Sequence, residues 1–313
     1  MKNFSVSLNF DSLAESYGWP SQFDEDNAYT KGLNRITDLC NKYQIPLTIF
    51  IVGKDLENKK NFKILKKLSE RNDIEIANHS YNHHHNFGAL NKKETYEEIY
   101  RSHEIIYKCT GKDCKGFVSP AWAISKNVIK SLIDMHYVYD TSFFRSIFLY
   151  PMVAKIFCSQ ILAKKYSRAF KIINRRDYFF PFKYKNEPFF LNANMKEVNK
   201  DDPNSILEIP VPVINNMQTP IWNTVGFFFG FDYLNKKLKI LLDRKKPFYF
   251  LIHPADFLDI NDTHPDYPVS LERMNSESHN SKLNKLENIF NLIISYGYQG
   301  KKIIDLAKEE KNK

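Results

Sequence analysis

The feature that most constrains the fold is a regular alternation of apolar, strand-like runs with helix-like segments in the first half of the chain. The strand-like runs lie at 4–11, 46–53, 74–77, on the approach to Pro120 and at 137–139, and the helix-like segments between them lie at 28–43, 62–70, 93–109 and 125–135. Strands joined through such segments run parallel, with right-handed crossovers. The pattern therefore predicts an α/β fold built on a parallel sheet or barrel.

The alternation resumes after residue 205. Strands are predicted at 207–211, 248–252 and 299–304, and helices at 231–243 and 282–296, with a Lys-rich end after Asp305 that we expect to fray. With 313 residues, of which 43% are hydrophobic, the chain can bury one substantial core. We therefore predict a single domain over 1–313, with an insertion at about 145–205.

Composition also suggests where the protein acts. No run of 18 apolar residues occurs, and the first strand begins almost at Met1, so we expect neither a transmembrane helix nor a signal peptide. Cys40, Cys109, Cys114 and Cys158 have no spacing typical of a disulfide framework. Reduced thiols and a cytoplasmic location are the simplest expectation.

Two imidazoles follow the third strand-like run. His79 and His83 are four residues apart, and on a helical turn their Cβ atoms would be roughly 6 Å apart, close enough for both rings to reach one divalent ion. A His-rich surface turn is the alternative, because His84 and His85 follow directly. A third ligand would decide between the two.

Asp11 is the candidate for that third ligand. The first strand ends on this carboxylate, and the carboxyl ends of parallel strands meet at one edge of a sheet. An aspartate in this position is also a common helix N-cap, so the residue alone does not decide the matter.

Together these residues resemble the polysaccharide deacetylase family, also called the NodB-homology or carbohydrate esterase 4 family. Five segments carry the resemblance in the family's order: Asn9–Ser12, His79–His83, Val118–Trp122, Tyr139–Ser142 and Leu251–Pro254. The resemblance spans roughly residues 4–255 and implies an irregular (β/α) barrel.

The chain departs from the family pattern at two points. The usual pair of aspartates is reduced to Asp11, and Val118 stands where the family has an arginine that holds the catalytic base. The chain can be aligned with the family's pair of aspartates in two ways. In the first alignment Asp11 is a metal ligand and Asn9 replaces the base. In the second alignment Asp11 is the base and Ser12 takes the ligand position. We prefer the first, because two histidines and a carboxylate make a plausible open site for a divalent ion, which we expect to be zinc.

The resemblance also implies roles for residues outside the ligand set. His253 is the expected general acid, and Asp140 the carboxylate that would pair with its imidazolium; a histidine buried in the core is the alternative for His253. Trp122, with Pro120 in the same motif, would form an apolar wall for the acyl group, or Trp122 is simply a buried aromatic.

The predicted insertion contains a basic run without acids. Residues 145–176 include seven Lys or Arg after Arg145, interleaved with aromatic and aliphatic side chains, and no Asp or Glu. Such a run can lie on the inner membrane surface, bind a phosphate-linked substrate, or form a lid with a solvated basic face. The net charge is +9, yet no nucleic-acid motif is present, so we expect no nucleic-acid partner.

These observations predict a metal-dependent amide hydrolase. Its substrate would be an N-acylated amino sugar in bacterial surface-glycan biosynthesis (lipopolysaccharide, O-antigen or capsule), carried on a nucleotide or a lipid. The alternative is a carbohydrate-binding relative that kept the barrel and lost the catalytic base.

Overall fold

The structure is a computed structural model that describes residues 2–14, 25–162, 166–173, 175, 180–215, 217–264 and 272–313. Its centre is a mainly parallel sheet whose strands adjoin in the order β11-β1-β2-β3-β4-β5-β8. These strands are β1 (Asn3–Phe10), β2 (Leu47–Ile51), β3 (Ile74–Asn78), β4 (Gly116–Phe117), β5 (Tyr139–Asp140), β8 (Ser205–Glu208) and β11 (Phe248–Ile252). The predicted parallel sheet is confirmed.

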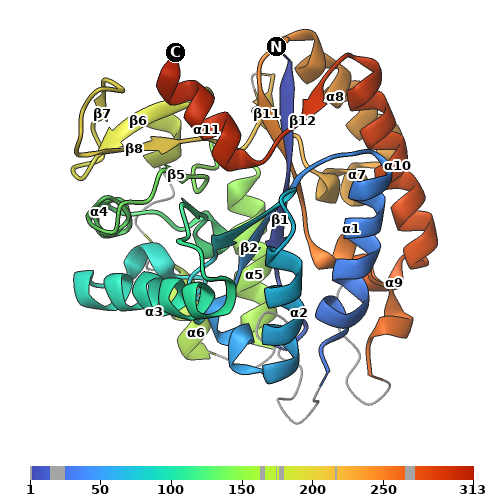
Figure 1. Cartoon of the computed structure of the whole chain (residues 1–313), viewed down its shortest axis with the longest axis horizontal. Coiled ribbons are helices and arrows are strands. Elements are labelled where there is room, and N and C mark those ends of the chain that lie inside the picture. The colour runs from blue at the N-terminus through green and yellow to red at the C-terminus, as the bar shows by residue number, and fades with distance from the viewer. Residues whose placement is uncertain are drawn as a thin grey trace.

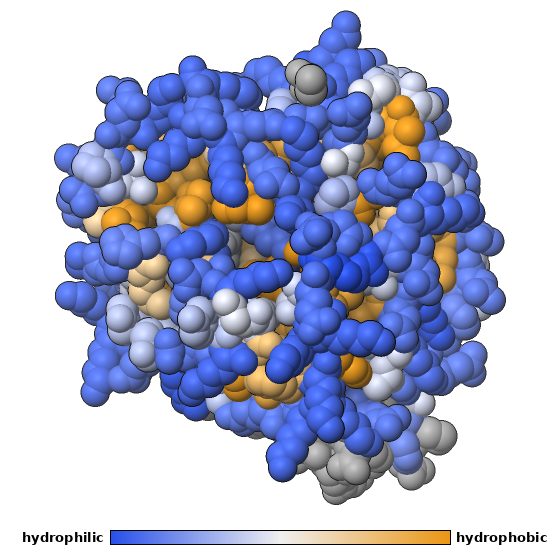
Figure 2. Space-filling view, in the orientation of Figure 1, coloured by the Kyte–Doolittle hydropathy of each residue, from blue (hydrophilic) through white to orange (hydrophobic). Residues whose placement is uncertain are grey.

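Helices follow the strands and surround them. They are α1 (Leu33–Lys42), α2 (Lys59–Ser69), α3 (Lys92–Thr110), α4 (Lys126–Asp134), α7 (Asn223–Phe229), α8 (Phe231–Asp243), α9 (Glu272–Asn275), α10 (His279–Ser295) and α11 (Ile303–Asn312). Figure 1 shows β1, β2 and β11 near the centre of the molecule, with α3 and α4 on one side and α1 and α10 on the other. The face seen in Figure 2 is mostly hydrophilic, as expected for the outer surface of such helices.

The sheet curls, so that its far strands approach one another. Tyr249 on β11 is buried, and the charges of Asp140 on β5 and Glu208 on β8 both raise its pKa in addition to the effect of burial. A further parallel bridge joins Trp222 to Leu251 beyond β11. The curl buries a core that includes Phe4, Val6, Leu8 and Phe10 of β1, each fully buried.

The segment between β5 and β8 is the predicted insertion. It contains α5 (Leu149–Leu162), α6 (Tyr166–Ile173), β6 (Phe189–Asn192) and β7 (Glu197–Val198), and β6 pairs antiparallel with β8. A short ribbon of β9 (Val213–Ile214) and β10 (Thr219–Pro220) follows β8. Lys164 and Lys165 of the basic run lie outside the described residues.

The end of the chain differs from expectation. The strand predicted at 299–304 is only β12 (Gln299–Gly300), and the segment predicted to fray is helix α11. The first backbone N–H groups of this helix donate to polar side chains at the amino end of the sheet: Ile303 to Oγ1 of the buried Thr48 and Ile304 to a carboxylate oxygen of the partly buried Glu75. A capped helix N-terminus docked on the sheet explains why a Lys-rich segment is ordered here.

None of the helices in the described part of the chain combines the length and apolarity needed to cross a bilayer. The four cysteines are free thiols, of which Cys40, Cys109 and Cys114 are buried and Cys158 is exposed.

Candidate functional site

Five sequence motifs meet at the carboxyl edge of the parallel strands. Asp11 follows β1, His79 follows β3, Asp140 ends β5 and His253 follows β11, while Val118 and the turn Pro120–Trp122 follow β4. Parallel strands in register bring these ends together although the residues are far apart in the sequence. The predicted location of the site is therefore matched by the topology.

Asp11, His79 and His83 form the group predicted to hold a metal ion. Oδ1 of Asp11 lies 3.8 Å from Nε2 of His79 and 3.2 Å from Nε2 of His83, and one ligand atom from each residue lies within 4.8 Å of the other two. Ligands bound to one tetrahedral zinc ion at about 2.0–2.1 Å are about 3.3 Å apart, so this spacing suits a single ion.

The hydrogen bonding of His79 supports the same interpretation. Nδ1 of His79 lies 2.7 Å from the carbonyl oxygen of Val118, so in the neutral ring Nδ1 carries the proton and Nε2 presents a lone pair. That lone pair faces the carboxylate of Asp11, which is also an acceptor. A cation between the two satisfies both, and the carbonyl contact fixes the ring as outer partners of metal ligands do.

The protonation states of Asp11 and His79 also favour a bound metal ion. Burial alone would raise the pKa of the Asp11 carboxyl, but His79 and His83 outweigh burial and hold that pKa well below its usual range. Burial lowers the pKa of His79, although Asp11 opposes the shift. At neutral pH the site therefore offers an ionised carboxylate and a neutral imidazole, the forms that bind a metal.

The turn that presents the histidines is not helical, contrary to the sequence prediction. Ser80 has φ of 64° and His83 has φ of 53°, and the two imidazole rings of His79 and His83 are 4.9 Å apart. Asn78 holds this turn: its Oδ1 accepts from the N–H of Ser80, and its Nδ2 donates to Tyr137 Oη. The strained left-handed residues bring the rings together where a helical turn was expected to do so.

The contacts of Ser12 and Asn9, on either side of Asp11, help to decide whether Asp11 is a metal ligand or the base. The hydroxyl of Ser12 donates to Oδ1 of the buried Asp55 at 2.6 Å, so Ser12 is committed to that carboxylate. Asn9 lies on β1 two residues before Asp11, and its backbone carbonyl accepts a hydrogen bond from the N–H of Asp11 at 3.0 Å. This arrangement favours Asp11 as the ligand and leaves an amide where the family has its base.

In the described part of the chain, Asp26 is the buried carboxylate that follows Asp11 in the sequence, and it does not supply an evident base. Asp26 is buried and accepts hydrogen bonds from the backbone N–H groups of Ala14 and Ala28, so its carboxylate is engaged by the backbone. Glu15 and Asp24, which are also near Asp11 in the sequence, lie outside the described residues.

His253 lies beside an aromatic cluster. The ring of Trp122 is 6.5 Å from the ring of His253 and stacks on Trp222 at 4.8 Å, and Phe144 contacts both tryptophans. Buried Pro120 opens the turn that carries Trp122, whose φ is 52°. Sequence reasoning missed Trp222 and Phe144, since isolated aromatics after weak strands carry no motif.

The electrostatic surroundings of His253 differ from those expected. Burial lowers the pKa of His253, and Asp11 and Asp256 oppose that shift. In the described structure no hydrogen bond joins His253 to Asp140, the carboxylate predicted to pair with it. Nδ1 of His253 and Oδ2 of Asp140 are both buried without a hydrogen-bond partner, so their pairing stays a prediction.

Asp140 instead has a carboxylate neighbour that the sequence did not reveal. Glu208 stands opposite Asp140 in the register of β5 and β8, and both side chains are fully buried. Ser142 Oγ donates to one oxygen of Asp140 at 2.5 Å, and the N–H of Phe143 donates to one oxygen of Glu208. Burial raises the pKa of Asp140 to about 6, and burial together with Asp140 raises the pKa of Glu208 further.

The second oxygens of this pair, Oδ2 of Asp140 and Oε2 of Glu208, have no other hydrogen-bond partner. A proton shared between the two carboxylates satisfies both, as in other buried carboxylate pairs. The only signal in the sequence is a glutamate within the apolar run Ile206–Val211.

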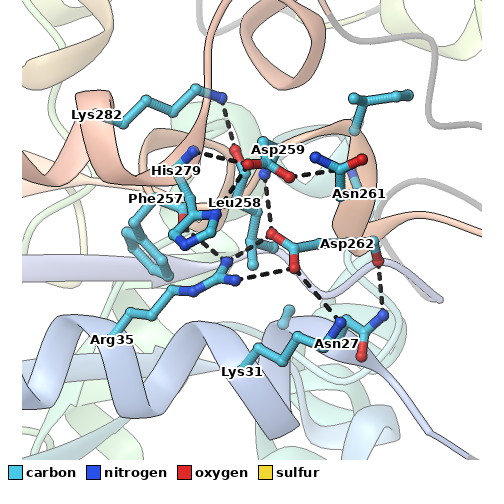
Figure 3. A network of polar contacts seen from close by, with 12 residues as sticks. Asn27, Lys31, Arg35, Phe257, Leu258, Asp259, Asn261, Asp262, His279 and Lys282 are labelled. Atoms are coloured by element: carbon cyan, nitrogen blue, oxygen red, sulfur yellow. Dashed lines mark hydrogen bonds and ion pairs between the residues drawn. The ribbon is translucent and has the colours of Figure 1, made fainter.

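A second group of possible ligands, Asp259, Asp262 and His279, is already occupied by protein donors (Figure 3). Arg35 donates to both oxygens of Asp262, at 2.5 and 3.1 Å. The backbone N–H and Nδ1 of His279 each lie 2.8 Å from Asp259, and Lys282 donates to the carbonyl of Leu258. This network ties the loop after His253 to α1 and α10.

Comparison with known proteins agrees with this geometry. Residues 3–139 match the family model described as polysaccharide deacetylase. The peptidoglycan deacetylase of Helicobacter pylori is 30% identical over 111 residues, which is 36% of this chain and 36% of that protein. The chain thus matches about a third of the length of this curated relative.

Solved structures extend the likeness to the whole fold. A candidate polysaccharide deacetylase from Mycobacterium smegmatis superposes with a TM-score of 0.59 at 13% identity, covering 98% of this chain and 90% of that one. A CE4 family pseudoenzyme from Bacillus anthracis gives a TM-score of 0.51 at 14% identity, covering 98% and 65%. The predicted α/β fold, an irregular barrel of the polysaccharide deacetylase type, is confirmed.

Proposed function

We propose that the protein is a metal-dependent amide hydrolase that removes an N-acyl group, most simply acetyl, from an amino sugar. The observation that carries this proposal is the convergence of Asp11, His79 and His83 next to a buried histidine and an aromatic wall. Three protein ligands with the fourth position open are typical of catalytic zinc sites. The family match over residues 3–139 supports the same reaction class.

The chemistry supplied by such an ion is polarisation of the amide carbonyl and activation of water near neutral pH. His253 has its pKa lowered by burial, so its imidazole is neutral at that pH and can accept a proton. The same ring can then donate that proton to the leaving amine. One histidine in both roles would explain how the site works with Asn9 in the position of the base.

Trp122 and Trp222 would bound the space for the acyl group. They lie stacked beside His253 and are largely buried, which suits a small apolar group and excludes water from it. For the sugar, we propose an amino sugar of a surface glycan under assembly, carried on a nucleotide or a lipid at the inner face of the membrane. The basic run at 145–176 supports a phosphate-bearing carrier.

The test is release of free amine from N-acetylated nucleotide sugars and lipid-linked glycans, measured with the purified protein before and after chelation and zinc addition. His253→Ala should lower kcat by about 10²–10⁴-fold, the range of general acid–base catalysis, and keep its metal. His83→Ala should lose both metal and turnover. His136→Ala is the control, because His136 is exposed in the turn between α4 and β5 and belongs to none of the five motifs.

The second candidate function is sugar binding without catalysis. The missing base at Asn9 favours it, and the fold likeness includes a CE4 pseudoenzyme. Stoichiometric sugar binding, with no amine released at any zinc concentration, would establish this candidate and reject the hydrolase.

A further inference from the structure

Helix α5 exposes few charged side chains among its described positions. Those that are exposed are Tyr150, Pro151, Ala154, Lys155, Cys158 and Leu162, and Leu162 is 84% exposed. Lys155 is the single charged residue among the 14 residues of this helix. A helix at a water-exposed surface normally carries several charged or polar side chains on its outer face. The composition of α5 is therefore unusual for a helix that faces only water.

Helix α7 adds two phenylalanines to the same surface. Phe228 is 52% exposed and Phe229 is 53% exposed. The ring of Phe229 lies 5.8 Å from the ring of Phe148, just before α5, and Nζ of Lys155 lies 4.8 Å over the ring of Phe228. We call these five residues, Phe148, Tyr150, Lys155, Phe228 and Phe229, the α5–α7 surface. They combine exposed aromatic rings with a cation.

The surface adjoins the candidate active site. Trp222, which stacks on Trp122 beside His253, immediately precedes α7. The seven residues of α7 span about 10 Å at 1.5 Å per residue, so the exposed phenylalanines lie about that far from the aromatic wall. A partner bound at this surface would lie next to the mouth of the site.

Together, the two segments that form the surface carry basic residues and no acid. Residues 145–176 contain no carboxylate, and α7 has no charged residue. Asp232 at the start of α8 is the first acid after α7, and Lys236 and Lys237 follow it. An anionic partner is therefore favoured over a neutral or cationic one.

We propose that the α5–α7 surface docks on an anionic lipid bilayer, with Phe228 and Phe229 in the interfacial layer and Lys155 among the headgroups. Aromatic rings prefer that layer, and interfacial segments combine them with basic residues in this way. A twofold contact between two copies would place two acid-free basic surfaces against each other, which like charge opposes. Docking would bring a lipid-linked glycan to the site, and in that respect it deepens the proposed function.

The experiment is flotation of the full chain with vesicles of phosphatidylcholine and phosphatidylglycerol in equal amounts, and with pure phosphatidylcholine. The wild type should float with the anionic vesicles, and more weakly with the neutral ones. Phe228→Ser with Phe229→Ser should weaken binding to the anionic vesicles by roughly tenfold or more, since two half-exposed rings are lost. Lys155→Gln should weaken it about fivefold, which is about 1 kcal/mol per cation, and leave neutral vesicles unchanged.

Matched controls separate the surface from general effects. Tyr96 and Tyr100 form an exposed stacked pair on α3, 42% and 43% exposed, and their change to serine should leave vesicle binding as in the wild type. Melting by circular dichroism confirms that each variant is folded. Vesicle binding needs no catalysis, so the two proposals can fail separately. A protein that releases no amine but still floats would contradict the proposed hydrolase activity and support membrane docking of the α5–α7 surface.

Two results would overturn the inference. One is a wild type that stays in solution with both vesicles, or a double phenylalanine variant that floats as well as the wild type. The other is a wild type that forms dimers without vesicles and a double variant that is monomeric, which would make a second copy of this chain the partner.

Discussion

At the scale of single residues, the buried Asp140–Glu208 pair makes a prediction about pH. Raised carboxyl pKa values mean that the folded protein holds a proton that the unfolded chain releases. This contribution to stability is complete below the ordinary carboxyl pKa and is lost as the pH rises through the raised values. Wild-type stability should therefore fall on the order of 1–3 kcal/mol as the pH rises from about 4, the ordinary carboxyl pKa, through the pKa of about 6 of Asp140.

Glu208→Gln tests this point, because a glutamine amide can donate to Asp140 in place of the shared proton. The variant should lose less stability over the same pH interval, as measured by urea unfolding at each pH. Glu97→Gln on the surface of α3 is the control and should follow the wild type. Parallel pH curves for Glu208→Gln and the wild type would mean that the pair does not hold a proton.

At the scale of elements, the loop after β11 depends on its ion pair with α1. Asp262 is 2% exposed in its side chain and Arg35 is 18% exposed, and two hydrogen bonds join them. In Arg35→Ala the buried carboxylate of Asp262 loses its two hydrogen bonds from Arg35. Lys31, whose Nζ lies 3.6 Å from Asp262, then balances the negative charge less well. We expect a loss of about 3 kcal/mol in the free energy of unfolding, measured by urea titration.

The exposed pair Lys93–Glu97 on α3 provides the comparison. Lys93→Ala should change stability by less than about 1 kcal/mol, as is usual for exposed ion pairs. Equal effects of Arg35→Ala and Lys93→Ala would show that the network in Figure 3 does not hold the His253 loop.

The elements also show what sequence patterns could and could not predict. Long helices with clear apolar spacing, such as α3 and α8, lie within two residues of their predicted bounds, because their periodicity reflects burial on the sheet. Helix α11 was missed, since its order comes from capping by Thr48 and Glu75, which are far away in sequence. The turn at His79 was mistaken for helix, because its geometry depends on hydrogen bonds from Asn78.

At the scale of the whole molecule, the candidate site is assembled from strand ends that only the sheet order brings together. The motifs allowed Asp11, His79, His83 and His253 to be placed at one edge from sequence, since parallel strands leave no other arrangement. Glu208 could not be placed in the same way, because its contact with Asp140 depends on the register between β5 and β8, which the sequence does not show. The ligand roles themselves stay predictions until a metal is measured.

The whole molecule should therefore report metal binding through its melting temperature. A ligand that binds only the folded state stabilises it by RT ln(1 + [L]/Kd), about 2.7 kcal/mol at a hundredfold excess over Kd. Zinc added to chelated wild-type protein should raise Tm by several degrees in a calorimetric scan, and His83→Ala should abolish the rise. Asp11→Asn then separates the two alignments. If Asp11 is a ligand, the zinc-dependent rise is lost together with turnover, whereas if Asp11 is the base, the rise remains and turnover alone is lost.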